Sequence, residues 1–489
     1  MAKKLNTVVE PVETTTVIDA PYEQPEGWRW GKLGDFIYIY RGVSYKKTDA
    51  HSEKLQNDCL ILRGGNIEEG KINTDADNVY VDKSLVSENQ FIKKNDVIIV
   101  TSTGSTKVIG RAGISDYDYS GVAFGAFLTL ARPNGKSDKL FVNQYFQSPL
   151  YRERIRQLAS GVNINNIRTD YITESPFPLP PTLAEQQRIV NRIESMFTKL
   201  DEAKEKAQNV VESFETRKAA ILHQAFTGNL TAKWRKENGI KSSEIDVILN
   251  KLFLIREKMI KNKEIQKPKI KENFDTNFVR ALFPEWKVVK LGSIAFVTKL
   301  AGFEYTKYIN LEETGDIPAI RAQNVRKGYL DESNLLYISK ETSEFLQRSA
   351  LTKKSVLVTF IGAGIGDVCV FDKETRYHLA PNVAKVEPFN SDKNEYIDVK
   401  YILYYLLSHF GQHEIFKDMK ATAQPSLSME TIRDITIPIP TIGEQKEIVR
   451  ILDTVLEKER TAKSAAEQIL EQIDLLKKSI LARAFRGEL

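Results

Sequence analysis

The side chains with the most evident chemistry in this 489-residue chain are basic and amide groups in loops of its two halves. Arginine pairs with guanine edges and asparagine or glutamine with adenine edges, whereas lysine binds phosphate. The candidates in the first half are Lys46, Lys47, Arg63, Asn66, Ser102, Thr103, Lys107, Arg111, Asn163, Asn165 and Asn166. Those in the second half are Tyr305, Lys307, Arg321, Asn324, Arg326, Lys327, Gln424 and Ser426. As a set, these residue types are the ones that a surface reading double-stranded DNA would use.

Two pairs of these candidates occupy the same places in the two halves. Arg63 and Asn66 lie in LRGGNIEEGKI, and Arg321 and Asn324 lie in the related segment IRAQNVRKGYL. Matched residues fit a role in the scaffold or at phosphates better than a role in telling bases apart. The prediction of base contact therefore concerns the set rather than any one member.

The strongest competing chemistry is a nucleotide-cofactor site in VLVTFIGAGIGD, residues 356–367. A cofactor loop of this kind must open a helix, whereas Gly366 leads into DVCVF, which is typical of a strand and predicts a hairpin. The chain also has no Asp/Asn-Pro-Pro-Tyr/Phe motif to hold a target amine. We therefore expect no catalytic residue and no bound cofactor, and an S-adenosylmethionine-dependent methyltransferase is the alternative hypothesis.

A metal site is the other chemistry that the histidines bring into question. His409 and His413 are spaced i, i+4 on a predicted helix and could share a metal ion. No glutamate of the His-Glu-x-x-His kind stands between them, and no third ligand is in view. We expect both to be ordinary polar helix positions and predict no metal.

The elements that must position the candidates include one long helix that occurs twice. PTLAEQQRIV from Pro181 reappears as PTIGEQKEIV from Pro440, and the same offset, 259 residues, relates AFTGNL to the terminal AFRGEL. Thr182 with Glu185, and Thr441 with Glu444, have the Thr-x-x-Glu spacing of a capping box, in which hydroxyl and carboxylate each satisfy a backbone amide. Gly228 and Gly487 then end the two helices.

Each predicted helix carries an apolar seam with alternating spacings of four and three residues. The first seam is Ile189, Ile193, Met196, Leu200, Ala203, Ala207, Val210, Phe214, Arg217 and Ile221. The second is Ile448, Leu452, Val455, Glu459, Ala462, Ala466, Ile469, Ile473, Leu476 and Ile480. A sustained repeat of 3.5 residues predicts a coiled coil. We expect the two helices to pair with each other in antiparallel fashion.

The segments before the helices also repeat, but loosely. WRWGKLGD from Trp28 is echoed by WKVVKLGS from Trp286, and each segment has short β-rich runs followed by a helix. The predicted fold class is α+β, with two similar globular domains joined by two long antiparallel coiled-coil helices in a pseudo-twofold (circular) arrangement. The predicted parts are a flexible tail (1–24), a first domain (25–180), a first helix (181–230), a basic helical connector (231–282), a second domain (283–438) and a second helix (439–489).

Positive charge is concentrated in the connector. The chain as a whole has a formal charge of +5, whereas residues 231–272 hold twelve Lys or Arg and six Asp or Glu, a net charge of +6. This run could follow phosphates through counterion release or be a solvated linker, and both interpretations stay open. The near-neutral domains suggest that partner subunits help to hold a duplex.

Cysteine content and hydropathy indicate where the protein works. Two cysteines are too few for a disulfide framework, and no stretch approaches the ~20 apolar residues of a membrane span. The predicted location is the cytoplasm, without a membrane partner.

With these motifs in place, the chain resembles the specificity subunits of type I restriction-modification systems over nearly its whole length. The markers are PEGW at Pro25, LRGGNI, PLPPTLAEQQRIV, AFTGNLTAKWR, FPEW at Phe283, PIPTIGEQKEIV and AFRGEL, in this order. The resemblance implies that each domain reads one half of an interrupted DNA sequence. It also implies that the helices form a spacer that docks two modification (methyltransferase) subunits, which carry S-adenosylmethionine.

The same resemblance leaves further partners open and has one structural rival. Restriction (translocase/nuclease) subunits could join the complex. A scaffold that binds proteins and not DNA is the remaining alternative, and it would bind scrambled and target DNA equally. The connector and the N-terminal tail are long for the family, which affects where the domain edges fall.

Overall fold

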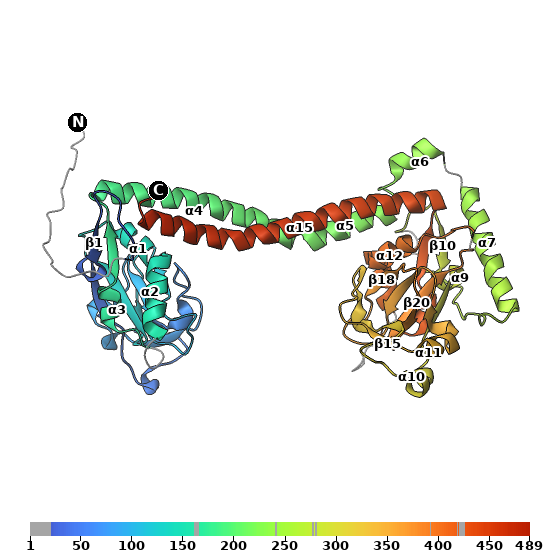
Figure 1. Cartoon of the computed structure of the whole chain (residues 1–489), viewed down its shortest axis with the longest axis horizontal. Coiled ribbons are helices and arrows are strands. Elements are labelled where there is room, and N and C mark those ends of the chain that lie inside the picture. The colour runs from blue at the N-terminus through green and yellow to red at the C-terminus, as the bar shows by residue number, and fades with distance from the viewer. Residues whose placement is uncertain are drawn as a thin grey trace. The chain divides into compact units, whose positions relative to one another are not determined.

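In the computed structural model of the protein, the described residues are 21–160, 166–239, 242–275, 278, 281–391, 393–417, 419 and 426–489. They form two compact units. The first contains residues 21–209 together with 466–489, and the second is Val210–Ala465. The long helix α15 (Ile442–Phe485) contributes residues to both (Figure 1).

The first unit is built on an antiparallel sheet in the order β2-β8-β5-β6 and a smaller sheet in the order β4-β3-β7, in which β3 and β7 are parallel. Strand β5 reads VIIV and is buried throughout because it is covered on both faces. The strands are β1 (Arg29–Lys32), β2 (Ile37–Arg41), β3 (Asp58–Leu62), β4 (Val79–Asp82), β5 (Val97–Val100), β6 (Ala112–Ile114), β7 (Val122–Phe124), β8 (Leu128–Pro133) and β9 (Pro176–Leu179). The helices of this domain are α1 (Lys139–Gln147), α2 (Pro149–Ser160) and α3 (Thr169–Thr173).

The second unit repeats this topology. Its main sheet has the order β11-β20-β17-β18, and its smaller sheet, β15-β12-β19-β16, again contains a parallel pair, β12 with β19. The strands are β10 (Lys287–Lys290), β11 (Ala295–Lys299), β12 (Ile317–Ile320), β13 (Val325–Arg326), β14 (Tyr329–Leu330), β15 (Leu336–Ile338), β16 (Ala350–Leu351), β17 (Ser355–Thr359), β18 (Val368–Phe371), β19 (Tyr377–Leu379), β20 (Val383–Pro388) and β21 (Thr436–Ile439). The helices are α9 (Leu291–Ile294), α10 (Gly302–Tyr308), α11 (Lys340–Phe345), α12 (Val399–Leu407), α13 (His409–Phe416) and α14 (Met429–Arg433). The α+β prediction is confirmed.

A buried glutamine joins the long helix to the domain in each unit. Gln186 Oε1 accepts the backbone amide of Asp138, which caps α1, at 2.8 Å. At the position 259 residues later, Gln445 Oε1 accepts the amide of Asp398, which caps α12, at 2.9 Å. Both glutamines are at most 1% exposed. The EQ pair of the repeated motif therefore has a structural role, because it fixes each domain to its helix.

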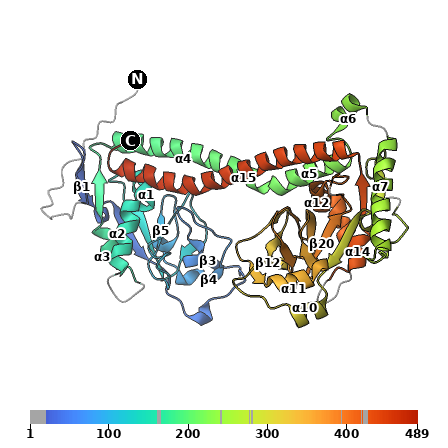
Figure 2. The ribbon, with the colours of Figure 1, turned by 45° about the vertical axis from the view of Figure 1, so that its right-hand side comes forward.

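In the first unit, α4 (Leu183–Glu212) runs antiparallel to the last part of α15 (Figure 2). Asp201 pairs with Lys477 at 2.6 Å, and Lys204 lies 4.0 Å from Asp474. Residue numbers therefore rise along one helix as they fall along the other, which is the antiparallel arrangement. In the second unit, α5 (Phe214–Phe226) runs antiparallel to the first half of α15. Lys463 lies 5.0 Å from the ring of Phe214.

The two polar exceptions in the predicted seams are partners of each other. Arg217 Nε donates to Glu459 Oε2 at 2.8 Å, and both side chains are about two-thirds or more buried (34% and 24% exposed). The pairing of the two seams by antiparallel contacts is thus confirmed within each unit.

The first long helix is not continuous, which corrects the prediction of one helix over residues 181–230. It breaks at Ser213, between α4 and α5. Arg217 turns back from the seam to donate to the Ser213 hydroxyl and, at 3.2 Å, to the Val210 carbonyl. In an unbroken helix that carbonyl would accept from the amide four residues on.

The second seam is also corrected toward the C-terminus. Ile469 and Leu476 are 44% and 48% exposed, whereas Ala466 and Ile473 stay buried. A helix of 3.6 residues per turn drifts by about 20° per heptad against a strict 3.5-residue repeat. The buried stripe therefore keeps the predicted positions Ala466 and Ile473 but leaves Ile469 and Leu476 on the surface.

The predicted capping boxes are confirmed for the threonines but not for the glutamates. Thr182 and Thr441 accept the amides of Glu185 and Glu444, at 3.2 and 3.4 Å. The carboxylates, however, do not return to the caps. Glu185 pairs with Arg188 at 2.8 Å on the surface, whereas Glu444 is buried by the connector.

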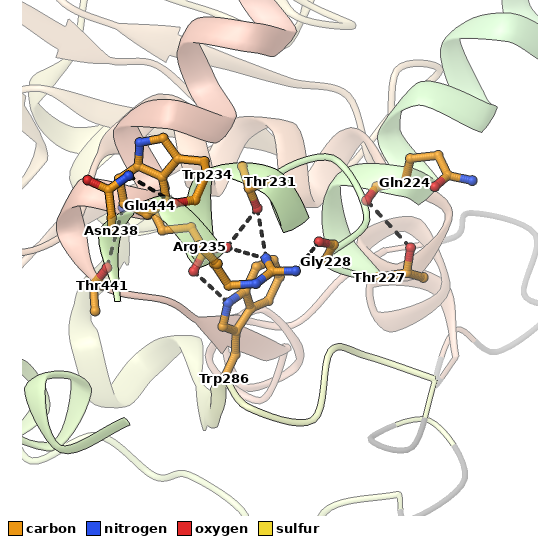
Figure 3. Close-up of polar contacts among 10 residues, drawn as sticks. All are labelled: Gln224, Thr227, Gly228, Thr231, Trp234, Arg235, Asn238, Trp286, Thr441 and Glu444. Carbon is orange, nitrogen blue, oxygen red and sulfur yellow. Dashed lines mark hydrogen bonds and ion pairs between the residues drawn. The ribbon is translucent and has the colours of Figure 1, made fainter. Parts of the chain in front are cut away.

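The connector begins with α6 (Ala232–Asn238) and α7 (Ser242–Lys261) and fastens onto Glu444 (Figure 3). The Glu444 carboxylate is 1% exposed and accepts from Thr231 Oγ1 at 2.7 Å and from Trp286 Nε1 at 3.0 Å. Arg235 forms an ion pair with the same carboxylate and stacks 4.0 Å above the Phe283 ring. Three segments far apart in sequence are thus joined at one buried charge.

The predicted tail is corrected at its end, because Tyr22 is fixed in place. Its hydroxyl donates to the Phe485 carbonyl, and its ring lies 4.9 Å from that of Trp30. Residues 1–20 of the predicted tail lie outside the described residues. Within the described part of the chain, no helix has both the length and the apolar character needed to cross a bilayer.

The buried Glu444 leads to a stability prediction with an internal control. Glu444→Gln leaves the buried Arg235 without its counter-charge and should cost about 3 kcal/mol of unfolding free energy. Glu185→Gln changes the matched residue at an exposed pair and should cost less than about 1 kcal/mol. Urea unfolding followed by tryptophan fluorescence measures both. Equal losses in the two variants would contradict the assigned role of Glu444.

Candidate nucleic-acid interface

The turn that follows β3 and β12 holds the matched asparagines. Asn66 Oδ1 accepts the Arg63 amide at 2.7 Å, and its Nδ2 donates to the Asn73 carbonyl at 2.9 Å. Asn324 makes the same bonds to the Arg321 amide, at 3.0 Å, and to the Asp331 carbonyl, at 2.9 Å. Both side chains are at most 1% exposed. Asn66 and Asn324 are therefore corrected from DNA contacts to scaffold residues, because the turns themselves use their amides.

The arginines of the same turns remain on the surface. Arg63 Nη1 lies 2.9 Å from Asp77 and its side chain is 49% exposed. Arg321 Nη2 donates to the Asn334 carbonyl at 2.7 Å. Each guanidinium is oriented by one acceptor and keeps other donors, so both stay candidates for phosphate or base contact.

Three loops meet in each domain at what we call the loop junction, residues 101–103, 126–128 and 166–167 in the first domain and 360–362, 381–383 and 426–427 in the second. A β-bridge joins Ser102 to Asn166, and another joins Ile361 to Ser426. The amides of Thr101 and Ser102 both donate to the Phe127 carbonyl, at 3.1 Å. The structure thus brings predicted Ser102, Thr103 and Asn166 together.

The second loop junction is held in the same way. The Phe360 amide donates to the Asn382 carbonyl at 2.9 Å, and the Leu427 amide donates to the Phe360 carbonyl at 2.9 Å. Ser426, next to it, is exposed. Asn163, Asn165 and Gln424 belong to the same late loops but lie outside the described residues.

Phe127 is the functional candidate that the sequence did not reveal. It follows the buried β7 and lies just before β8, yet its side chain is 69% exposed. Asn382, with a left-handed φ of 72°, stands at the corresponding place in the second domain. The sequence signal that could have pointed to Phe127 is an aromatic residue in the short glycine-containing segment FGAF, which links two strands.

A cavity of about 620 Å³ adjoins the first loop junction. Phe127 and Tyr45 supply aromatic walls, while Lys47 and Arg63 bring cations and His51 an imidazole. His51 Nε2 lies 2.5 Å from Asp58 Oδ2, and this hydrogen bond holds the pKa of Asp58 below its usual range. The structure therefore gathers predicted Lys47 and Arg63, with exposed Lys46 adjacent.

The remaining candidates of the first domain lie on the loop between β5 and β6. Arg111 Nη1 donates back to the Ile67 carbonyl at 3.2 Å, which ties this loop to the Asn66 turn. Lys107 is exposed. The buried Arg152 supports the loop through the Ile109 carbonyl at 2.9 Å, and burial lowers its pKa.

The remaining candidates of the second domain fall into two places. Arg326 and Lys327 form the exposed turn between β13 and β14, with Arg326 3.8 Å from Asp331. Burial raises the pKa of the nearby Asp367 carboxyl, while Lys327 and Arg326 act in the opposite direction. On α10, Lys307 lies 5.1 Å from the Tyr308 ring, and Tyr305 packs against a core cluster. The turn at Arg326 and Lys327 is positively charged, whereas the equivalent turn of the first domain is negatively charged because Glu68 and Glu69 occupy these positions.

The glycine-rich run of the cofactor alternative is the hairpin between β17 and β18. Strand β17 pairs antiparallel with β18, and Gly362 and Gly366 have φ of 107° and 83°. The amides of Gly366 and Asp367 donate to the Thr359 and Gly364 carbonyls, each at 2.9 Å. These two amides therefore donate within the turn, as the hairpin prediction requires.

The two histidines on α13 make ring contacts. His413 stacks on Phe278 with centroids 5.5 Å apart, and His409 meets Phe410 edge-on at 6.2 Å. Within the described residues, no three His, Cys, Asp or Glu side chains lie together in a way that could hold a metal ion.

Comparison with known proteins places this architecture in a family. The model of the type I restriction modification DNA specificity domain matches residues 25–213 and again 284–472, two stretches separated by the same 259-residue offset as the repeated helices. The chain is 28% identical to the EcoKI specificity subunit of Escherichia coli K12 over 473 residues, which cover 95% of this chain and 90% of that protein. It is 24% identical to the StySPI specificity subunit of Salmonella potsdam, with coverage of 95% and 90%.

Solved structures show the same fold. The HsdS subunit from Thermoanaerobacter tengcongensis superposes with a TM-score of 0.59 at 18% identity, over 97% of this chain and 100% of that one. A chain from a study of assembly and conformational transition in the type I R-M system gives 0.63 at 17% identity, over 96% and 100%. Because the family model covers more than half of its length, in two copies, this chain belongs to the type I restriction modification DNA specificity family.

Proposed function

We propose that this chain is the DNA-reading, non-catalytic specificity subunit of a type I restriction-modification complex, and that each recognition domain reads one half of a bipartite target. The observation that carries the proposal is that one scaffold occurs twice with different side chains at equivalent surfaces. Ser102, Asn166 and Phe127 in the first loop junction correspond to Ile361, Ser426 and Asn382 in the second. Two equal scaffolds with unequal surfaces suit a target of two unequal words.

The chemistry at each loop junction suits the reading of base edges. An exposed asparagine such as Asn166 can bind adenine in a bidentate fashion, and an exposed ring such as Phe127 can contact a thymine methyl group or stack on a base. The opposite charges of the turns at Glu68 and Arg326 further separate the two surfaces. We infer that the loop junctions carry discrimination and that Lys46, Lys47, Arg63 and Arg321 hold the backbone.

The antiparallel helices are the element that we propose sets the gap between the two words. Helix α15 is a single helix of 44 residues, about 66 Å at ~1.5 Å per residue. Gln186 fixes the first recognition domain to α4, which pairs with the last part of α15, and Gln445 fixes the second recognition domain to α15 itself. The pseudo-twofold arrangement of the domains stays a prediction.

An exposed apolar strip on α15 suits the docking of a modification subunit. Ile469, Leu475 and Leu476 are 44%, 66% and 48% exposed on a helix that is otherwise rich in charge. Exposed apolar patches of this kind mark protein interfaces. We propose that two modification subunits bind the helical spacer and bring S-adenosylmethionine, and that restriction subunits could join this cytoplasmic complex.

The two alternatives are less well supported. The hairpin at residues 359–368 uses the amides of Ile365, Gly366 and Asp367 within its own turn, which disfavours a cofactor loop of a methyltransferase at this place. A scaffold that does not read DNA would not account for loop junctions that share their backbone hydrogen bonds but carry different side chains in the two domains. Binding that is equal for target and scrambled DNA would favour the scaffold.

A change at Phe127 should alter the reading of the first word alone. Phe127→Ser is expected to weaken methylation of the target about 10-fold through loss of a base contact, with an unchanged melting temperature. Tyr38→Ser, which removes a 56% exposed ring elsewhere on the same domain, should leave methylation unchanged. Methylation-sensitive sequencing of a host that carries each variant measures the effect. A loss of preference in the second word, or none in the first, would contradict the assignment.

Shortening the spacer should shorten the gap. Deletion of residues 201–207 together with 471–477 removes one heptad from each helix and keeps the register, because Asp201 pairs with Lys477 and Lys204 with Asp474. About 10 Å is lost, so the gap should shrink by about three base pairs at ~3.4 Å each. Sequencing of the methylated sites reads both words and the gap. Recovery of the original gap would refute the proposal that the helices act as a ruler.

The apolar strip should be required for partner binding. Leu475→Gln with Leu476→Gln is expected to reduce affinity for the modification subunit by about 10-fold or more, because apolar burial at the interface is lost. Val247→Gln with Leu254→Gln, which changes two exposed apolar residues of α7, is the control. Co-purification and titration with the modification subunit measure both. If the control loses as much affinity as the test variant, docking lies elsewhere.

A further inference from the structure

The basic connector continues past α7 along the second domain and is fastened to it. Ile265 is 8% exposed and belongs to the core of this unit. Six residues on, the Lys271 amide donates to Asp434 Oδ1 at 2.8 Å, and its ammonium lies 3.8 Å from the same carboxylate. Since residues 262–275 form neither helix nor strand, these anchors give the segment its path. The connector at this point is part of the surface of the domain rather than a free linker.

Between the two anchors the segment borders a groove of about 440 Å³, which we call the connector groove. Its opposite wall is β11, the edge strand of the main sheet. Arg433 Nη2 donates to the Val297 carbonyl of this edge at 3.1 Å. Arg348, held by Glu304 at 2.7 Å, also lines the groove.

The charge of the connector groove is strongly unbalanced. Its charged lining consists of Lys263, Lys267, Lys269, Arg348 and Arg433 against a single acid, Glu264. All three lysines are exposed, and no carboxylate of the described residues lies within ion-pair distance of them. By contrast, a second groove of the same domain holds four lysines, among them Lys353, Lys354 and Lys393, against four acids. The excess of positive charge is therefore a local property of the connector groove and does not extend over the whole surface of the domain.

We propose that the connector groove binds the phosphate backbone of duplex DNA beside the half-word that the second recognition domain reads. This inference rests on the proposed function. Unpaired lysines that release counterions from DNA are the main source of sequence-independent affinity. Residues 283–436 are close to neutral, with 19 basic and 20 acidic residues, so the connector supplies the charge that this domain lacks.

The test uses three variants of the full chain in complex with its modification subunits. Lys263→Gln, Lys267→Gln and Lys269→Gln together remove the unpaired charge. Lys353→Gln, Lys354→Gln and Lys393→Gln together remove the same charge from the balanced groove of the same domain. Replacement of the first three lysines by arginine keeps the charge. Exposed lysines are removed in each case, so thermal melting should show intact folding.

Fluorescence anisotropy of labelled target DNA at several salt concentrations gives the slope of log affinity against log salt. The connector triple should reduce this slope by about three relative to the wild type, whereas the balanced-groove triple and the arginine triple should not. Hydroxyl-radical footprints should lose protection beside the second half-word and keep it at the first. An unchanged slope, an equal loss in the two glutamine triples, or a symmetric footprint would overturn the proposal.

Scrambled DNA separates this inference from the proposed function. If the wild-type complex binds target and scrambled DNA equally, sequence reading fails, but the slopes of the variants still test the groove. If the wild type prefers its target and the connector triple has the wild-type slope, the groove alone fails.

Discussion

The structure depends on the attachment of each recognition domain to its long helix. A buried glutamine of the long helix, Gln186 or Gln445, accepts the amide of the N-cap residue of a domain helix, so the domain cannot rotate relative to its long helix without leaving polar groups unsatisfied. Buried tyrosines of the domain helices, Tyr145 and Tyr405, donate to the carbonyls of Pro176 and Thr436 in β9 and β21, the strands that precede the long helices. A reading surface is useful only if its orientation is fixed, and these bonds fix it relative to the helix within each unit.

Duplication explains both what is shared and what differs. The supports are kept between the halves, as in the turn that Asn66 and Asn324 close. The residues presented to solvent have diverged, as with Phe127 and Asn382, or with Glu69 and Lys327 in the equivalent turn. A scaffold that satisfies its own polar groups leaves its surface free to change without loss of stability.

The sequence predicted the elements whose causes are local or periodic. The α+β class, the paired helices and the hairpin at Gly366 follow from strand runs, a 3.5-residue seam and glycine spacing. It could not predict the partner of Glu444, because Arg235 and Trp286 arrive through tertiary packing. Asn66 is buried and so is no longer a candidate for DNA contact, whereas Phe127 is exposed and becomes one. Residue type alone predicts neither the burial of Asn66 nor the exposure of Phe127.

The ion pair between Arg217 and Glu459 affects which long helices can pair when two copies of this chain meet. The constant offset makes Leu476 the twin of Arg217 and Leu200 the twin of Glu459. Were two copies of the first helix to associate in the same antiparallel register, Arg217 would face Leu200; were two copies of the second to associate, Glu459 would face Leu476. Each pairing of like helices places a charge against a leucine, so the first helix pairs with a second helix in preference to another copy of itself.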